Sequence, residues 1–227
     1  MGENKNNLSQ EAYDILLREI MTLELAPNQP VKEVEVSSRL NISRTPVRTA
    51  IQKLLSYGFI KQDPIKGNVV ADMSVEHFEK IFQVREAFEY SSVIAATKKW
   101  ETKDLLEIEE KYIHNNEEEM IESTDNVSLF LKDMNFHKSI AKIGGNEILY
   151  GGLSIIIDHF FRYNYLANKM KRQFKNRGEH QAILDMIRTR NCFLAENMMR
   201  QHLATVKEEI YENLTNIELV KYQDNPQ

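Results

Sequence analysis

The chain has 227 residues and a formal net charge of −5, with 29 Lys and Arg against 34 Asp and Glu. This length allows two modest domains, and the overall acidic balance argues against nucleic-acid binding by the chain as a whole. The charge is unevenly spread, however. Residues 37–71 contain six basic side chains and one acidic one, whereas residues 73–227 contain 20 basic and 25 acidic ones. The sequence therefore indicates a basic unit followed by an acidic unit of different function.

Cysteine content and hydropathy restrict where the protein works. The single cysteine, Cys192, excludes an internal disulfide framework and is typical of a reducing compartment. No segment approaches the ~20 apolar residues of a membrane span. Residues 1–7 are polar and lack the apolar core of a signal peptide. We therefore expect a cytoplasmic protein with no membrane partner.

A helix-turn-helix is predicted after a first helix over residues 8–25. The chain forms a short helix, turns at residues 41–42, and starts a second helix at Ser43. The Ser43 hydroxyl is expected to act as an N-cap, because it can accept a hydrogen bond from a free backbone N–H of the first turn. Gly58 is expected to end this second helix.

The second helix has one apolar face and one polar face. At about 100° per residue, the inner face carries apolar side chains and the outer face carries Arg, Thr and Gln. The inner residues are Val47, Ala50, Ile51 and Leu54, and the outer ones are Arg44, Thr45, Arg48, Thr49 and Gln52. Such an outer face suits the major groove, where Arg pairs with guanine and Gln with adenine. The alternative is an ordinary amphipathic surface helix.

The next segment favours DNA binding. Residues 59–70 indicate two short strands around a tip that contains Pro64, Lys66 and Gly67. A helix-turn-helix followed by a hairpin with a basic tip is a winged helix. The predicted DNA-binding domain covers residues 1–72.

In this region the chain resembles the GntR family of bacterial transcription regulators. The resemblance is carried by residues 31–33, Leu40, the run Ser-Arg-Thr-Pro-Val-Arg at 43–48, the helix end at 54–58 and the Lys-Gly pair of the wing. It implies that the helix opened by Ser43 binds double-stranded operator DNA. Because one winged helix reads only a few base pairs, we expect a homodimer on a near-palindromic site. The implied DNA-binding residues are Ser43, Arg44, Thr45, Arg48, Lys66 and Gly67. The chain departs from the family at Thr49-Ala50, where many members have Glu-Ala, so its operator preference is expected to differ.

Only helical periodicity is present beyond the predicted boundary at residues 72–74. We expect an all-α bundle of about six helices over residues 73–219, followed by a disordered polar tail over residues 220–227. The expected helices cover residues 75–100, 102–121, 126–143, 147–168, 178–189 and 191–216. The fold class is thus mostly α, and such bundles place ligand sites between facing helices.

Four residues of this bundle form a candidate metal site. Asp133 and His137 are four residues apart and share one face of a helix, while His180 and His202 lie on two later helices. Three imidazoles and one carboxylate suit Zn²⁺, Ni²⁺ or Mn²⁺ with coordination positions left open. The alternative is that these histidines are scattered core or surface residues.

The same region looks like the FCD ligand-binding domain of the FadR-like GntR subfamily. The matching segments are residues 133–137, Gly145-Asn146, residues 179–184 and His202-Leu203, together with Arg85 and Glu89. In metal-binding members the matching Asp and His residues hold a divalent metal, with a small carboxylate bound beside it. This resemblance implies that Asp133, His137, His180 and His202 are metal ligands.

A bound organic acid also needs a cationic partner. Arg85 is the first candidate and Arg162 the second, because a guanidinium can hold a carboxylate through two hydrogen bonds. The alternative for each is a helix-surface salt bridge, such as Arg85 with Glu89.

These expectations define one leading function and two alternatives. The leading hypothesis is a transcription regulator, not an enzyme, whose operator binding is modulated by a small carboxylate bound beside a divalent metal. One alternative is a metal-dependent helical hydrolase, since an open metal site can activate water. The other is a regulator whose metal is purely structural.

Overall fold

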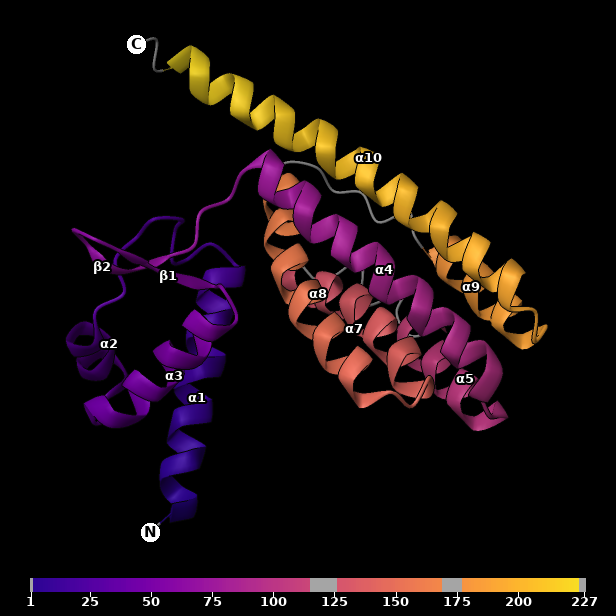
Figure 1. Cartoon of the computed structure of the whole chain (residues 1–227), viewed down its shortest axis with the longest axis horizontal. Helices are drawn as coiled ribbons and strands as arrows, with labels where there is room; N and C mark the ends of the chain where they lie inside the picture. Colours follow the sequence, from indigo (N-terminus) through magenta and orange to yellow (C-terminus); the bar gives the residue numbers. More distant parts are fainter. Residues whose placement is uncertain (1, 115–125, 169–176, 225–227) are drawn as a thin grey trace. The chain divides into compact units, whose positions relative to one another are not determined.

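The computed structural model describes residues 2–114, 126–168 and 177–224. The chain divides into two compact units, Met1–Ser74 and Val75–Gln227, each with its own core (Figure 1). The predicted boundary between residues 72 and 73 lies beside this division. No helix in the described part of the chain is long and apolar enough to cross a membrane.

The N-terminal unit is a winged helix-turn-helix. It contains three helices, and its two strands pair antiparallel with Ile60 opposite Val70 and Asp63 opposite Gly67. The elements are α1 (Gly2–Met21), α2 (Glu33–Leu40), α3 (Arg44–Ser56), β1 (Ile60–Asp63) and β2 (Gly67–Val70). A single hydrophobic core joins them, and its fully buried members include Leu16, Ile20, Val47, Ile51, Leu54 and Phe59.

Local sequence chemistry explains the turns of this unit. Asn41 follows α2 in the left-handed conformation at φ 53°, which Asn tolerates better than most residues. Gly58 follows α3 at φ 80°, as its predicted role at the helix end requires. At the hairpin tip, Oδ1 of Asp63 accepts hydrogen bonds from the backbone N–H groups of Ile65 and Lys66.

Two local expectations for this unit need correction. Ser43 occupies the N-cap position of α3, but its side chain makes no capping hydrogen bond. The first helix ends at Met21 and not near Leu25, because Leu23 adopts a left-handed conformation at φ 59°.

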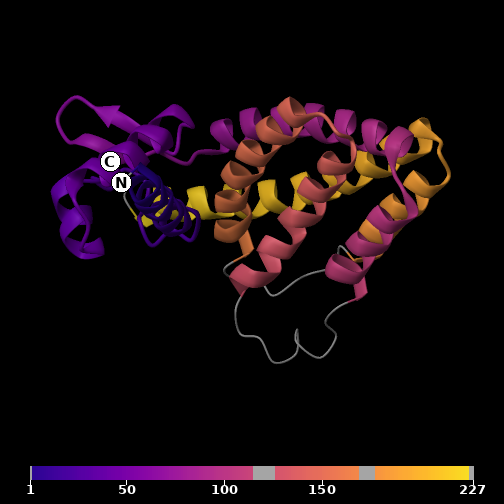
Figure 2. The same ribbon diagram turned by 90° about the horizontal axis from the view of Figure 1, so that it is seen from below.

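The C-terminal unit is the predicted helical bundle. Helix α4 packs against α7, α8 and α10, and α10 also packs against α9 (Figures 1 and 2). The elements are α4 (Val75–Lys99), α5 (Thr102–Ile108), the π-helix η1 (Glu109–His114), α7 (Asn126–Ile143), α8 (Glu147–Asn168), α9 (Arg177–Arg188) and α10 (Cys192–Asp224). Buried aromatic side chains from α4, α7 and α8 fill its centre, among them Phe78, Phe82, Phe136 and Phe160.

The bundle differs from the sequence expectation in two segments. The helix predicted over residues 102–121 changes from α to π geometry at Glu109, and residues 115–125 lie outside the described part. The last helix continues past residue 216 to Asp224, into the segment expected to be a tail. Glu, Leu, Lys and Gln are good helix formers, which favours this extension. Residues 225–227 lie outside the described part.

Candidate metal centre and DNA-binding surface

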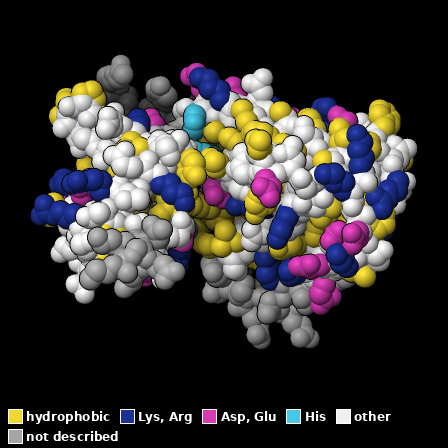
Figure 3. All heavy atoms as spheres, turned by 60° about the horizontal axis from the view of Figure 1, so that its bottom comes forward, with side chains coloured by type: hydrophobic (Ala, Val, Ile, Leu, Met, Phe, Trp, Pro, Cys, Tyr) yellow, Lys and Arg dark blue, Asp and Glu magenta, His cyan; other side chains and the backbone are white. Residues whose placement is uncertain are grey.

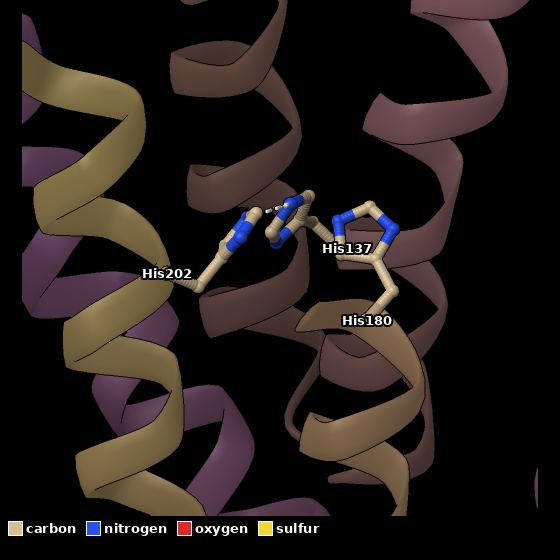
Figure 4. Close-up of side chains that lie close together, drawn as sticks. All are labelled: His137, His180 and His202. Carbon is tan, nitrogen blue, oxygen red and sulfur yellow. Dashed lines mark hydrogen bonds between the residues drawn. The ribbon is translucent and has the colours of Figure 1, made fainter. Parts of the chain in front are cut away.

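Three helices bring His137, His180 and His202 together inside the bundle. His137 lies on α7, His180 on α9 and His202 on α10, and Figure 4 shows their rings directed toward a common point. One ligand atom from each lies within 4.8 Å of the other two, and all three residues are buried. Residues separated by long stretches of sequence therefore form one compact cluster.

Each histidine has a neighbour that orients its ring. Nδ1 of His202 is hydrogen-bonded to Oε2 of Glu179 at 2.7 Å. Nδ1 of His137 lies 3.0 Å from Oε1 of Glu89. The ring of His180 stacks on Phe136 with 4.0 Å between the ring centroids. At the cluster centre, Nε2 of His137 and Nε2 of His202 are 3.3 Å apart.

Asp133 lies at the edge of this cluster. Its Oδ1 is 3.3 Å from Nε2 of His180, but this nitrogen is buried and makes no hydrogen bond. A buried ring nitrogen without a hydrogen bond is costly unless another partner satisfies it. A metal ion is such a partner, because neutral imidazole nitrogens and carboxylate oxygens are established ligands of Zn²⁺ and similar ions. The donor set present therefore fits a divalent metal.

The electrostatics also favour neutral imidazoles. Burial lowers the pKa of His180 well below its ordinary value, and the neighbouring His202, His137 and Arg85 lower it further. Burial likewise lowers the pKa of His202, although its hydrogen bond to Glu179 opposes this shift. Because only an unprotonated imidazole nitrogen can bind a metal, both residues are in the required state at neutral pH.

Arg85 lies inside the bundle, contrary to the alternative of a helix-surface ion pair. Its Nε donates a hydrogen bond to Oε1 of Glu89 at 3.1 Å, and the two side chains are 1% and 0% exposed. Its Nη1 is buried without a hydrogen bond. Burial alone raises the pKa of Glu89, but His137 and Arg85 outweigh burial and lower this pKa to about 2. Arg162 is also completely buried, on α8.

The predicted DNA-binding residues are exposed on the N-terminal unit, at the start of α3 and at the hairpin tip. Ser43 through Thr45 and Arg48 are exposed at the start of α3, while Pro46 and Val47 of the same turn are buried. Lys66 and Gly67 are exposed at the tip of the hairpin. The outer face of α3 is thus free of core packing, as a helix that enters a groove requires.

Two acidic residues at these sites received no role from the sequence. Glu33 contacts Arg48 and Glu179 contacts His202, and both belong to segments that carried the family resemblance. Only the adjacency of Glu179 to His180 hinted at a supporting role. The partner of Glu179 is on another helix, so no spacing rule could find it.

A winged helix-turn-helix ahead of a helical bundle with a buried histidine cluster defines a class, the DNA-binding transcription regulators with a ligand-binding domain. Residues 8–70 match the family described as bacterial regulatory proteins, gntR family, and residues 80–205 match the FCD domain. The chain belongs to the GntR family and carries a C-terminal FCD domain.

Individual relatives agree with this assignment. The chain is 26% identical to the HTH-type transcriptional repressor RspR of Escherichia coli, with 89% of each chain covered. It is 28% identical to the Uxu operon regulator of Haemophilus influenzae, over 79% of this chain and 73% of that one. The structure of Escherichia coli McbR/YncC shares the fold with a TM-score of 0.76 and 16% identity, over 90% of this chain and 97% of that one. The relatives are regulators and not enzymes, so they give the hydrolase alternative no support.

Proposed function

We propose that this protein represses transcription as a homodimer in the cytoplasm, and that a small carboxylate bound beside a divalent metal controls its affinity for operator DNA. The proposal rests on the short distance between the histidine cluster and a buried cation, Arg85. Glu89 contacts both His137 and Arg85, and Nη1 of Arg85 has no hydrogen bond. A ligand carboxylate can satisfy this donor and complete the coordination of the metal.

The metal would be held by His137, His180, His202 and Asp133, with Zn²⁺, Ni²⁺ and Mn²⁺ as the candidate ions. When bound, it supplies a positive charge and an open coordination position for a carboxylate oxygen. The protein's own contribution would be orientation, because Glu89, Glu179 and Phe136 each contact one of the three rings. Arg85 adds a second, directional contact for the acid, and Arg162 is the weaker candidate.

Residues on α3 and on the hairpin would contact the operator. We assign Arg44, Thr45 and Arg48 to the major groove, with Ser43, Lys66 and Gly67 nearby. The proposal of repression follows RspR, which is named a repressor. Two-fold symmetry in the protein would match a near-palindromic operator.

An exposed apolar face on the bundle supports the homodimer. Val84 of α4 is 41% exposed and Ile148 of α8 is 88% exposed. On α8, Ile148 shares a helix face with Gly152 and Ile155. A Cβ at Gly152 would lie 2.9 Å from the Phe88 ring, so the faces of α4 and α8 adjoin there. Figure 3 shows hydrophobic side chains gathered on one face of the C-terminal unit, and such faces mark interaction sites.

Metal analysis combined with DNA binding tests this function. Purified protein is analysed for bound metal, and its affinity for genomic fragments is measured with and without a panel of small carboxylates. We expect one metal per chain and an acid that changes operator affinity about 5–150-fold. A metal-free protein that still responds to its acid would contradict the mechanism. A single chain per operator in sedimentation would contradict the dimer.

A further inference from the structure

Glu89 contacts both parts of the proposed site. Its Oε1 lies 3.0 Å from Nδ1 of His137 and accepts a hydrogen bond from Nε of Arg85 at 3.1 Å. Glu89 and His137 are completely buried, and Arg85 is 1% exposed. One carboxylate oxygen therefore lies between a candidate metal ligand and the candidate anion-binding residue.

The contact with His137 determines which ring nitrogen faces the metal. A carboxylate beside Nδ1 favours the tautomer with its proton on Nδ1 and its lone pair on Nε2. Nε2 of His137 lies 3.3 Å from Nε2 of His202, so this lone pair is directed into the cluster. Nδ1 of His137 is buried and lies 3.0 Å from Oε1 of Glu89, and no other partner in the described part of the chain satisfies it.

The contact with Arg85 determines which edge of the guanidinium is available. Glu89 holds Nε, while the buried Nη1 makes no hydrogen bond. The guanidinium carbon lies 4.0 Å from the centroid of the Phe160 ring, which further restricts its position. Arg85 is therefore held with an N–H group that can donate a hydrogen bond to a ligand oxygen.

We propose that Glu89 is a positioning residue that couples the two binding events, because the same oxygen orients His137 for the metal and Arg85 for the carboxylate. This inference rests on the proposed function above. It requires that loss of the Glu89 charge weakens both metal and anion binding. A carboxylate that contacts only a histidine ligand should change the affinity for the metal and leave the affinity for the anion unchanged.

Glu179 provides the matched comparison. Its Oε2 is hydrogen-bonded to Nδ1 of His202 at 2.7 Å, so it also places a carboxylate oxygen beside Nδ1 of a candidate metal ligand, but it makes no bond to Arg85. Glu86 provides the control on α4 itself, since its carboxylate accepts a hydrogen bond from the hydroxyl of Tyr90 at 3.0 Å. The substitutions are Glu89→Gln, Glu179→Gln and Glu86→Gln, which all remove one negative charge and keep the side-chain shape.

Two affinities are measured for each protein: that for Zn²⁺ by competition with a chelating dye, and that for acetate at zinc saturation by calorimetry. We expect Glu89→Gln and Glu179→Gln to lower zinc affinity by about 10–100-fold. Only Glu89→Gln should also lower acetate affinity, and Glu86→Gln should change neither. Unchanged zinc or acetate affinity in folded Glu89→Gln protein overturns the inference. Absence of zinc binding by the unaltered protein would instead contradict the proposed function.

A second measurement needs no substitution at Glu89, whose loss leaves Arg85 buried without a charged partner and can impair folding. The unaltered protein is labelled with ¹⁵N-histidine, loaded with zinc, and its ring nitrogens are observed by NMR. The His137 signals are assigned by their absence from His137→Gln protein. We expect a proton on Nδ1 and the metal on Nε2. A metal on Nδ1 of His137 overturns the positioning role of Glu89.

Discussion

Arg48 is held by Glu33 through a two-pronged ion pair. Nε of Arg48 lies 3.1 Å from both carboxylate oxygens of Glu33, and its Nη2 lies 3.0 Å from Oε2. The contact joins the outer face of α3 to the first turn of α2. The hydrogen bonds from Arg48 lower the pKa of Glu33, so the carboxylate is ionised at neutral pH. The ion pair therefore sets the orientation of the Arg48 guanidinium in the structure.

We predict that Arg44→Ala and Arg48→Ala each weaken binding to the operator while the protein stays folded. Loss of a two-pronged contact to a base should lower specific affinity by about 5–150-fold. Fluorescence anisotropy with operator DNA measures this effect. Arg18→Ala is the control, because Arg18 is an exposed arginine on α1, outside the α3 face. Operator affinity that stays at the wild-type value in both variants would refute the recognition-helix assignment.

Glu33→Gln should reduce specificity more than affinity. Without the carboxylate, Arg48 loses its fixed orientation, which weakens discrimination among bases. The substitution also removes one negative charge, so the net charge rises by one, which strengthens non-specific binding and steepens its salt dependence. Titrations against operator and scrambled DNA at several salt concentrations measure both effects. Glu35→Gln is the control, because it makes the same charge change at a residue that forms an exposed ion pair with Lys32 and not with Arg48. Equal specificity ratios in the two variants would show that charge alone explains the result.

The double substitution His180→Ala with His202→Ala should abolish metal binding and the response to the effector, while basal operator binding persists. The reason is that the two residues supply ligands from α9 and α10, whereas DNA contacts come from the N-terminal unit. Metal analysis and operator titration with the effector test this. His77→Gln is the control, since His77 is hydrogen-bonded to the hydroxyl of Tyr163 and lies outside the histidine cluster. A double variant that retains the effector response would show that effector sensing does not depend on these histidines.

Removal of the metal should lower the melting temperature of the C-terminal unit. A ligand present at about 100 times its dissociation constant stabilises the folded state by about 2.7 kcal/mol. Calorimetry of chelator-treated and zinc-reloaded protein measures the change. If chelation unfolds the bundle and no carboxylate binds the zinc-loaded protein, the metal is structural and not sensory.

The sequence by itself determined the features that depend on one helix or one turn. The apolar face of α3, the turn at residues 41–42 and the stop at Gly58 follow from spacing and backbone preference, and the structure agrees with each. The placement of Asp133 and His137 on one face of α7 follows in the same way. The distribution of basic residues also marked the winged helix correctly.

Only the tertiary structure decided which faces of different helices meet. Helical periodicity shows which residues share a face of a helix, but it does not show which other helix packs against that face. The spacing of Arg85 and Glu89 therefore suited a surface pair equally well, and packing of α4 against α7 and α10 buried both residues beside His137. The pairings of Glu179 with His202 and of Glu33 with Arg48 also join separate elements. Their geometry depends on helix packing, which residue spacing along the chain does not encode.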